Sequence, residues 1–239
     1  MISVCIASYN GEKYIKEQLE SILKQLDKND EIILSDDHSN DRTLEVVSEL
    51  NDSRIKVFMN EKEHGYTRNF ENALSKAHGD FIFLSDQDDV WVENKVNIMV
   101  KSLESADIAI SDASVTDQYL QVNQISHFRA NKVKQGFWTN FLRTRYIGAC
   151  MAFRKDILER VLPFPEDQVH CPHDYWIAMI GEMYYRVQLI NEPLLLYRRH
   201  ENNALTGGNK STNSISKRIY TRIYVMFHLL RRSFNWSFR

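Results

Sequence analysis

Three carboxylates, Asp86, Asp88 and Asp89, stand within four residues of one another, directly after the apolar run FIFLS. A run this short is typical of a buried strand, so the acidic cluster is expected at a strand end. Because like charges this close repel one another, they favour a nearby cation or a bound proton. Magnesium and manganese take oxygen ligands and keep positions for substrate phosphates, so the cluster indicates a protein that handles a phosphorylated small molecule. The competing interpretation is that Asp88 or Asp89 caps the following helix.

The first part of the chain alternates between strand and helix patterns. Buried runs predict strands at 2–8, 31–35, 54–59, 81–85 and 106–111, and amphipathic stripes predict helices at 12–26, from about 40, at 67–77 and at 92–104. Such alternation predicts an α/β fold, Rossmann-like, with a mostly parallel sheet and helices on both faces. Ligands in that architecture bind beyond the carboxyl ends of the strands.

Polar groups fall at three of those predicted strand ends: Ser8 to Gly11, then Asp36 and Asp37, then the Asp86 cluster. One pocket is therefore expected to hold all three. Each also has a simpler explanation, since Asn-Gly favours a turn and Ser39 or Asp41 is suited to capping a helix. Their joint placement favours a binding site. Because the chain has neither a P-loop nor a GxGxxG glycine cradle, a metal is expected to carry the phosphate recognition.

Length and composition bound the class of protein. A chain of 239 residues with 43% hydrophobic content builds one large α/β domain, or a domain plus an appendage. It has no apolar run of about 18 residues, and its start, MISVCIASYN, lacks the basic region of a signal peptide, so a cytoplasmic protein is expected. Three cysteines without CxxC spacing predict neither a disulfide framework nor a zinc site.

The net charge of −2 conceals an asymmetry. No acidic residue follows Glu201, whereas seven basic residues do: Lys210, Lys217, Arg218, Arg222, Arg231, Arg232 and Arg239. Subtracting these seven from the 30 basic residues leaves 23 against 32 acidic ones, or −9 for the rest. Residues 206–213 are predicted to be a polar connection and 214–232 an amphipathic helix. A basic amphipathic helix suits an anionic membrane interface; the competing interpretation is a helix docked on the main domain or on a partner.

The segments ISVCIASYNG, LSDDHSNDRT and FIFLSDQDDVW, in that order, resemble the family 2 glycosyltransferases of the GT-A type. Those are inverting enzymes that use nucleotide-sugar donors. Downstream, RYIGACMAFRKDIL resembles their acceptor-side segment and LYRRHENN their C-terminal histidine segment. The resemblance covers residues 1–205 and leaves 206–239 as a linker and basic amphipathic tail.

The resemblance implies roles for particular residues on the donor side. Asp86 and Asp88 form the DxD element, which binds the donor through a divalent metal; Asp88 is the direct metal ligand and His200 a second one, unless His200 is an ordinary pocket histidine. The nucleoside contacts are Ala7, Tyr9, which stacks on the base, and Asp37, which accepts the imide N–H of uracil or thymine. The diphosphate or base edge is assigned to Arg68 and Asn69.

On the acceptor side, inversion requires a base on the face opposite the leaving group. The resemblance assigns this role to Asp174, with His173 replacing the usual Glu of a Glu-Asp pair and Asp112 as the runner-up base. Asp174 is also suited to capping the helix that it begins. Tyr175 and Trp176 are expected either in the wall of the acceptor pocket or in the core.

Together these features predict an inverting hexosyltransferase that depends on Mn²⁺ or Mg²⁺. It is expected to move a sugar from a UDP- or dTDP-sugar to a lipid-linked oligosaccharide of a surface polysaccharide, such as O-antigen or capsule. It would work at the inner face of the cell membrane, without a nucleic-acid partner. One alternative is a sugar-phosphate nucleotidyltransferase, although SYNGEKY is not the glycine-rich basic loop expected there. The other is a non-catalytic module with an acidic pocket, such as a receiver domain.

Overall fold

The structure is a computed structural model that describes residues 1–201 and 214–237, with side chains through Ser233. The strands are β1 Ile2–Ser8, β2 Glu31–Asp36, β3 Ile55–Met59, β4 Phe81–Asp86, β5 Val90–Trp91, β6 Ile108–Thr116, β7 Val122–Gln124, β8 Met151–Arg154 and β9 Val187–Arg198. The α-helices are α1 Ile15–Leu23, α2 Thr43–Glu49, α3 Tyr66–Ser75, α4 Lys95–Ser102, α5 His127–Asn131, α6 Phe137–Arg143, α7 Leu158–Val161, α8 His173–Tyr184 and α9 Ile215–Ser237.

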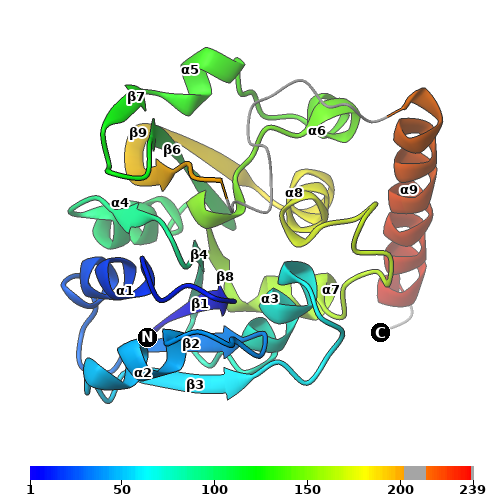
Figure 1. Cartoon of the computed structure of the whole chain (residues 1–239). Helices are drawn as coiled ribbons and strands as arrows, with labels where there is room; N and C mark the ends of the chain where they lie inside the picture. The colour runs from blue at the N-terminus through cyan, green and yellow to red at the C-terminus, as the bar shows by residue number, and fades with distance from the viewer. Residues whose placement is uncertain (202–213, 238–239) are drawn as a thin grey trace.

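These strands form one sheet in the order β3-β2-β1-β4-β8-β6-β9-β5, with β7 paired to β6. Helices α1 and α4 lie on one side of the sheet and α3 and α8 on the other (Figure 1). The chain moves outward from β1 to β3 and then crosses back to β4 on the other side of β1. This reversal is a topological switch point, where α/β sheets open a crevice for ligands.

The carboxyl ends of the first strands meet at one edge, as the sequence predicts. Strands β3, β2, β1 and β4 are parallel, and their register pairs Ser8 with Asp36 and Ala7 with Asp86. Strand β2 is buried along its whole length, and Ile15, Leu19 and Ile22 of α1 are fully buried, as expected for the predicted stripe. The three polar groups that were expected to form one pocket, at the ends of β1, β2 and β4, therefore lie on adjacent strands.

The other half of the sheet is mixed. Strand β8 runs antiparallel to both β4 and β6, whereas β9 is parallel to β6 and antiparallel to β5. The chain leaves β6 into β7, α5 and α6, which Figure 1 shows at one end of the sheet, and returns as β8. Parallel neighbours need a crossover connection, whereas a return from the same end gives an antiparallel pair. The α/β fold is confirmed, with parallel pairing concentrated in the first half.

Helix α9 is docked against α8 (Figure 1). Val225 and Leu229 are fully buried, the Tyr184 hydroxyl donates to the Leu229 carbonyl at 3.0 Å, and the Asp167 N–H donates to the Tyr224 hydroxyl at 3.0 Å. The docked-helix interpretation therefore holds for one face of the tail. The predicted polar connection at 206–213 lies outside the described residues. Within the described ranges, no helix is both long and apolar enough to span a bilayer.

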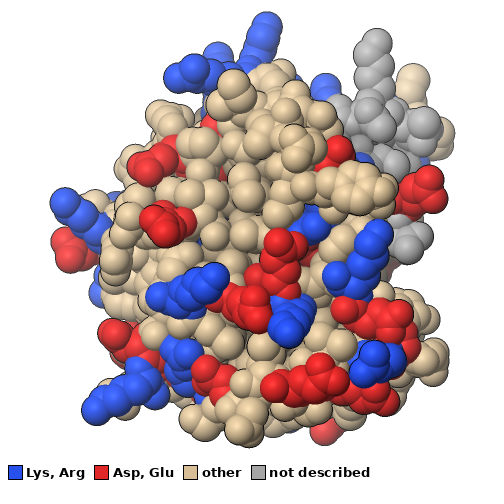
Figure 2. All heavy atoms as spheres, turned by 60° about the vertical axis from the view of Figure 1, so that its left-hand side comes forward, with Lys and Arg blue, Asp and Glu red and all other residues tan. Residues whose placement is uncertain are grey.

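Acidic and basic side chains are interspersed over the face of the molecule in Figure 2. A mixed surface of this kind produces little long-range field of one sign. The three cysteines, Cys5, Cys150 and Cys171, are buried and free.

Candidate active site

A cavity of about 1200 Å³ opens at the switch point between β1 and β4. The carboxyl ends of these strands line it, together with the first turns of α3 and α8, the end of β9 and the segment 144–148. Pockets for one small molecule occupy about 300–1,000 Å³. The cavity therefore has room for two substrates side by side.

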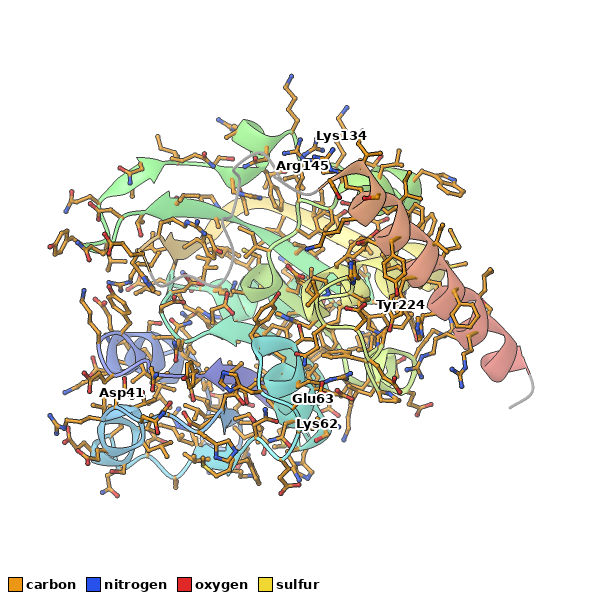
Figure 3. All side chains as sticks on the ribbon, turned by 45° about the vertical axis from the view of Figure 1, so that its right-hand side comes forward. Asp41, Lys62, Glu63, Lys134, Arg145 and Tyr224 are labelled. Atoms are coloured by element: carbon orange, nitrogen blue, oxygen red, sulfur yellow. The ribbon has the colours of Figure 1, made fainter. Side chains whose placement is uncertain are left out.

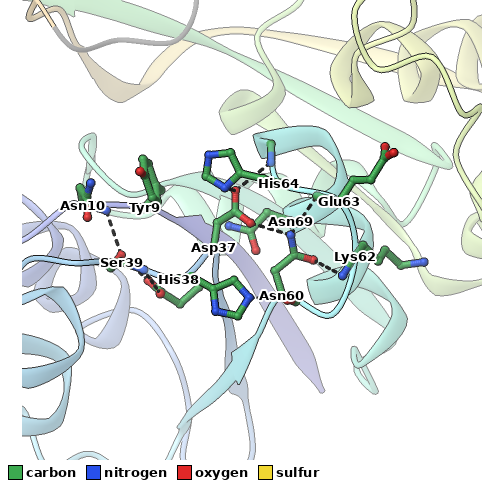
Figure 4. Close-up of polar contacts among 12 residues, drawn as sticks. Tyr9, Asn10, Asp37, His38, Ser39, Asn60, Lys62, Glu63, His64 and Asn69 are labelled. Carbon is green, nitrogen blue, oxygen red and sulfur yellow. Dashed lines mark hydrogen bonds and ion pairs between the residues drawn. The ribbon is translucent and has the colours of Figure 1, made fainter.

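Asp37 forms a preorganised acidic corner in this cavity (Figure 4). Its carboxylate accepts the Gly65 N–H at 2.8 Å and the Asn60 side-chain amide at 2.7 Å, and lies 2.8 Å from His64 Nδ1. Gly65 has a φ of 134°, which L side chains rarely adopt, so glycine is required where its N–H meets Asp37. Tyr9 meets His64 edge to face at 4.8 Å between ring centroids. A carboxylate has about four acceptor sites, so one remains for a ligand.

Asn69 offers a second acceptor beside this corner. Its Nδ2 donates to the Ser8 carbonyl at 3.0 Å, whereas its buried Oδ1 has no hydrogen-bond partner in the described part of the chain. A buried acceptor left unpaired costs about 1–3 kcal/mol, which a ligand N–H or O–H would offset. Ala7 and Tyr9 line the cavity next to it. The structure thus brings the predicted nucleoside contacts Ala7, Tyr9 and Asp37 together with Asn69, which was predicted to contact the diphosphate or base edge.

Asp86, Asp88 and His200 line the same cavity, as expected for the predicted metal site. The Asp88 Oδ2 and His200 Nε2 atoms are 2.8 Å apart, and the His200 ring stacks on Tyr14 at 4.8 Å. Burial, followed by the charges of Asp88 and Asp174, raises the pKa of Asp86 to about 8. The carboxylates in this cavity therefore repel one another, and a cation would relieve the repulsion.

The donor set fits an open metal site. In residues 1–201 and 214–237, no three His, Cys, Asp or Glu side chains are grouped closely enough to form a complete metal site. Asp88 and His200 supply a carboxylate and an imidazole in direct contact. A cation held by these two would need further ligands from a substrate, and Mg²⁺ and Mn²⁺ commonly take phosphate oxygens in this way.

Asp174 faces the cavity from the first turn of α8. Its Oδ1 accepts the N–H of Tyr175 at 2.7 Å, so it satisfies one first-turn donor while still lining the cavity. Burial raises the pKa of Asp174 to about 6. A carboxylate with that pKa is ionised at neutral pH and is more basic than an exposed aspartate.

His173, beside Asp174, is a neutral imidazole. Burial lowers its pKa to about 3, and its ring stacks on Phe70 at 4.1 Å. Gly148 packs against both residues of this pair: a Cβ there would lie 2.9 Å from His173 Nε2 and 3.3 Å from the Asp174 Cβ. The acceptor-side segment therefore approaches the start of α8 closely because residue 148 has no side chain.

Comparison with known proteins identifies the family. Residues 3–162 match the model of Glycosyl transferase family 2. The matched segment is more than half of the 239 residues. The chain belongs to this family. The membership decides against both alternatives, the nucleotidyltransferase and the receiver-like module.

Two curated relatives and one solved structure extend the comparison. The chain is 32% identical over 193 residues to UDP-Glc:alpha-D-GlcNAc-diphosphoundecaprenol beta-1,3-glucosyltransferase WfgD of Escherichia coli, covering 76% of this chain and 70% of the relative. It is 28% identical over 227 residues to dTDP-rhamnosyl transferase RfbG of Shigella flexneri, covering 90% and 78%. S. aureus TarS 1–349 in complex with UDP-GlcNAc matches with a TM-score of 0.70 at 19% identity, over 94% of this chain and 66% of that one. This last likeness shows the GT-A type of fold.

In this family 2 glycosyltransferase, Asp89 does not line the cavity with Asp86 and Asp88. Asp89 is fully buried, and its Oδ1 accepts the Arg198 N–H at 2.9 Å, while Arg198 Nε donates to the Asp88 carbonyl at 2.7 Å. Asp89 thus ties the Asp88 loop to the end of β9, which leads to His200. The capping interpretation of Asp88 and Asp89 is wrong, since α4 begins at Lys95 after Asn94.

Asp112, the runner-up base, lies outside the cavity lining. It accepts the N–H groups of Ala113 at 2.7 Å and Phe128 at 2.8 Å, as well as the Ser126 hydroxyl. It therefore anchors the start of α5 to β6, and the structure does not favour it as the base.

Tyr175 and Trp176 are core residues, so the pocket-wall expectation is wrong. The Tyr175 hydroxyl donates to the Phe141 carbonyl and Trp176 Nε1 to the Val161 carbonyl, both at 2.9 Å. Both side chains are buried, at 4% and 0% exposure, and neither lines the cavity.

Arg68 also has a structural role that the sequence did not reveal. Its guanidinium pairs with Glu71 at 2.6 Å and donates to the carbonyls of Pro165 at 3.1 Å and Glu166 at 2.9 Å. The side chain is buried and does not line the cavity. Arg68 fixes the segment before α8, so its predicted contact with the diphosphate or the base edge is not supported by its position.

The cavity also contains residues that the sequence reasoning missed: His64, Gly65, Arg145, Tyr197 and Arg199. Arg145 and Arg199 fall inside the two downstream segments that resemble the family, RYIGAC and LYRRHENN, so the segments were found but not these side chains. Gly65 stands directly before α3 with a positive φ. A glycine just before a predicted helix was the available signal.

Proposed function

We propose that this glycosyltransferase moves a hexose from a UDP- or dTDP-sugar to a lipid-linked oligosaccharide, with inversion, in the synthesis of a surface polysaccharide such as O-antigen or capsule. The observation that carries the proposal is that two kinds of side chain line different sides of one cavity. An acidic and imidazole wall, Asp86, Asp88 and His200, comes from the ends of β4 and β9, and Asp174 comes from α8. The names of the E. coli and S. flexneri relatives, with their UDP-glucose and dTDP-rhamnosyl donors, support the substrate class.

The donor's pyrimidine base is assigned to the Asp37 corner. Uracil and thymine present an imide N–H between two carbonyls, and Asp37 retains acceptor capacity for that N–H. The exposed ring of Tyr9, held edge to face by His64, offers a stacking surface. The unpaired Asn69 Oδ1 would accept a further donor from the nucleoside.

Asp88 and His200 would hold the divalent cation, Mn²⁺ or Mg²⁺. When bound, such a cation acts as a Lewis acid that stabilises charge on the departing nucleoside diphosphate. Asp174 takes the proton from the acceptor hydroxyl as the hydroxyl oxygen attacks the sugar carbon and the nucleoside diphosphate leaves. His173 stays neutral beside it, because burial lowers its pKa to about 3, and so adds no charge next to the base.

The enzyme is proposed to work at the inner face of the cell membrane, as a peripheral protein that binds anionic lipid through α9. Its proposed acceptor resides in the membrane. The segment from residue 214 onward has no acidic residue, which suits an anionic surface.

Calorimetric titration of the chain with UDP, dTDP, GDP and ADP in the presence of Mn²⁺ tests the donor class. We expect UDP or dTDP to bind at least about tenfold more tightly than ADP, because a buried carboxylate that pairs with an imide N–H rejects adenine, which has no ring N–H to donate. The matched variant Asp37→Asn should lose most of this preference. Tightest binding of GDP or ADP would contradict the assignment.

A further inference from the structure

Two helices that are distant in sequence present exposed apolar side chains at the same end of the molecule. On α6, Trp138 is 67% exposed and Leu142 68% exposed. On α9, a stripe with spacings of four and three residues is also exposed: Ile215, Ile219, Ile223, Phe227 and Leu230. The Arg222 guanidinium donates to the Leu142 carbonyl at 2.5 Å, so the helices touch, and Figure 1 shows α6 beside the first turns of α9. These seven apolar residues are called the α6–α9 surface.

The apolar stripe on α9 is not needed to hold the helix in place. Val225 and Leu229, which are fully buried against the domain, lie away from the exposed stripe, and the Tyr224 hydroxyl also meets the domain, where it accepts the Asp167 N–H. Tyr224 is directed toward the domain in Figure 3. Helical geometry of 100° per residue places Ile219, Ile223 and Phe227 roughly opposite Val225. The docked face and the exposed stripe are therefore separate, and the stripe is free to contact something else.

Basic side chains border this surface. Arg143 ends α6 and Arg231 lies near the end of α9, and both are exposed. Apolar side chains with an exposed tryptophan, bordered by positive charge, match the interface of an anionic bilayer, where acyl chains meet negative headgroups.

The surface also connects directly to the acceptor side of the cavity. The segment 144–148 follows α6 without a break, lines the cavity, and reaches the catalytic side at Gly148, against Asp174. Arg145, in the same segment, lines the cavity and carries a charge suited to phosphate. A lipid surface on α6 would thus lie a few residues of chain away from the proposed base.

We propose that the α6–α9 surface binds an anionic bilayer and holds the acceptor side of the cavity at the level of the lipid headgroups. Bilayer binding stands on the exposed residues and charges themselves. Its use for a lipid-linked acceptor rests on the proposed function. The new element is α6, which extends the membrane contact beyond the C-terminal helix and joins it to the active site.

Co-sedimentation of the full chain with vesicles tests this, using phosphatidylcholine alone and phosphatidylcholine with phosphatidylglycerol. We expect binding to the anionic vesicles that weakens as salt rises. The double variants Trp138→Ser/Leu142→Ser and Ile219→Ser/Phe227→Ser should each bind at least about tenfold more weakly, since the burial of one large apolar side chain corresponds to about that factor or more. Val122→Ser on β7, which removes an apolar side chain that is 51% exposed away from α9, should bind like the wild type.

The double variant Arg143→Gln/Arg231→Gln supplies a second arm that changes no apolar contact. It should weaken binding to anionic vesicles and leave transfer to a short soluble acceptor unchanged. Wild-type affinity in the α6 variant, or no binding of the wild type to anionic vesicles, would overturn the proposal. The wild type could instead self-associate with rising concentration and fail to bind vesicles. If the same variants abolish that self-association, the surface binds a second copy of the chain and the proposal is overturned. If the wild type transfers no sugar to the soluble acceptor, that result counts against the proposed function and not against bilayer binding.

Discussion

Asp174→Asn is expected to bind the donor like the wild type and to transfer sugar at least about a hundredfold more slowly, as is typical when a general base is lost. The amide has nearly the same shape and can still accept the Tyr175 N–H, so α8 should begin as before. What it loses is the ability to take a proton from the acceptor hydroxyl. Donor titration and initial rates with a short acceptor measure the two effects separately.

The pH dependence provides an independent check on the same residue. Because burial raises the pKa of Asp174 to about 6, the base is ionised above that pH and protonated below it. Transfer by the wild type should therefore fall as the pH drops below about 6, by about tenfold per pH unit. Asp174→Asn should lack this limb. Asp112→Asn, a matched change outside the cavity, should retain the limb; if Asp112→Asn loses transfer and Asp174→Asn does not, the base is wrongly assigned.

Asp88→Ala is expected to abolish the effect of Mn²⁺ on UDP binding and to lower turnover by at least about a hundredfold, since a Lewis-acid metal contributes several kcal/mol to a transition state. Asp88→Asn is the sharper variant, because its carboxamide can still bond His200 but carries no charge. Calorimetry with UDP, with and without Mn²⁺, and thermal unfolding as a control for the fold, make the measurement. UDP binding that remains equally metal-dependent in both variants would contradict the site.

The location of the site follows from the sequence because parallel strands bring their carboxyl ends to one edge of a sheet. Asp37, Asp86 and Asp88 could be placed together before any coordinates, since each follows a buried run. The side of the strand was harder to predict. Asp86 and Asp88 both line the cavity, as does Gln87 between them, whereas Asp89, which follows the turn at Gln87 and Asp88, is directed inward to Arg198.

Long-range partners set the remaining roles, and local patterns do not encode them. Arg68 bonds carbonyls almost a hundred residues away, at Pro165 and Glu166. In the amphipathic helix predicted at 214–232, the four-residue spacing of Ile215, Ile219 and Ile223, with Phe227, marks an apolar stripe that the structure leaves exposed, whereas the docked Val225 lies outside it. When a helix has apolar residues on two sides, the sequence pattern indicates a single apolar stripe. Only the packing of the folded protein shows which of the two sides is buried.

The most direct test of the central claim is the product of transfer itself. The chain is incubated with Mn²⁺, a UDP- or dTDP-sugar of known anomeric configuration and an oligosaccharide linked to a lipid diphosphate, and the product linkage is read by NMR. We predict one sugar added for each nucleoside diphosphate released, with the anomeric configuration opposite to that in the donor. A product that retains the donor's configuration, or nucleotide release without any transfer across the donor panel, would contradict the account.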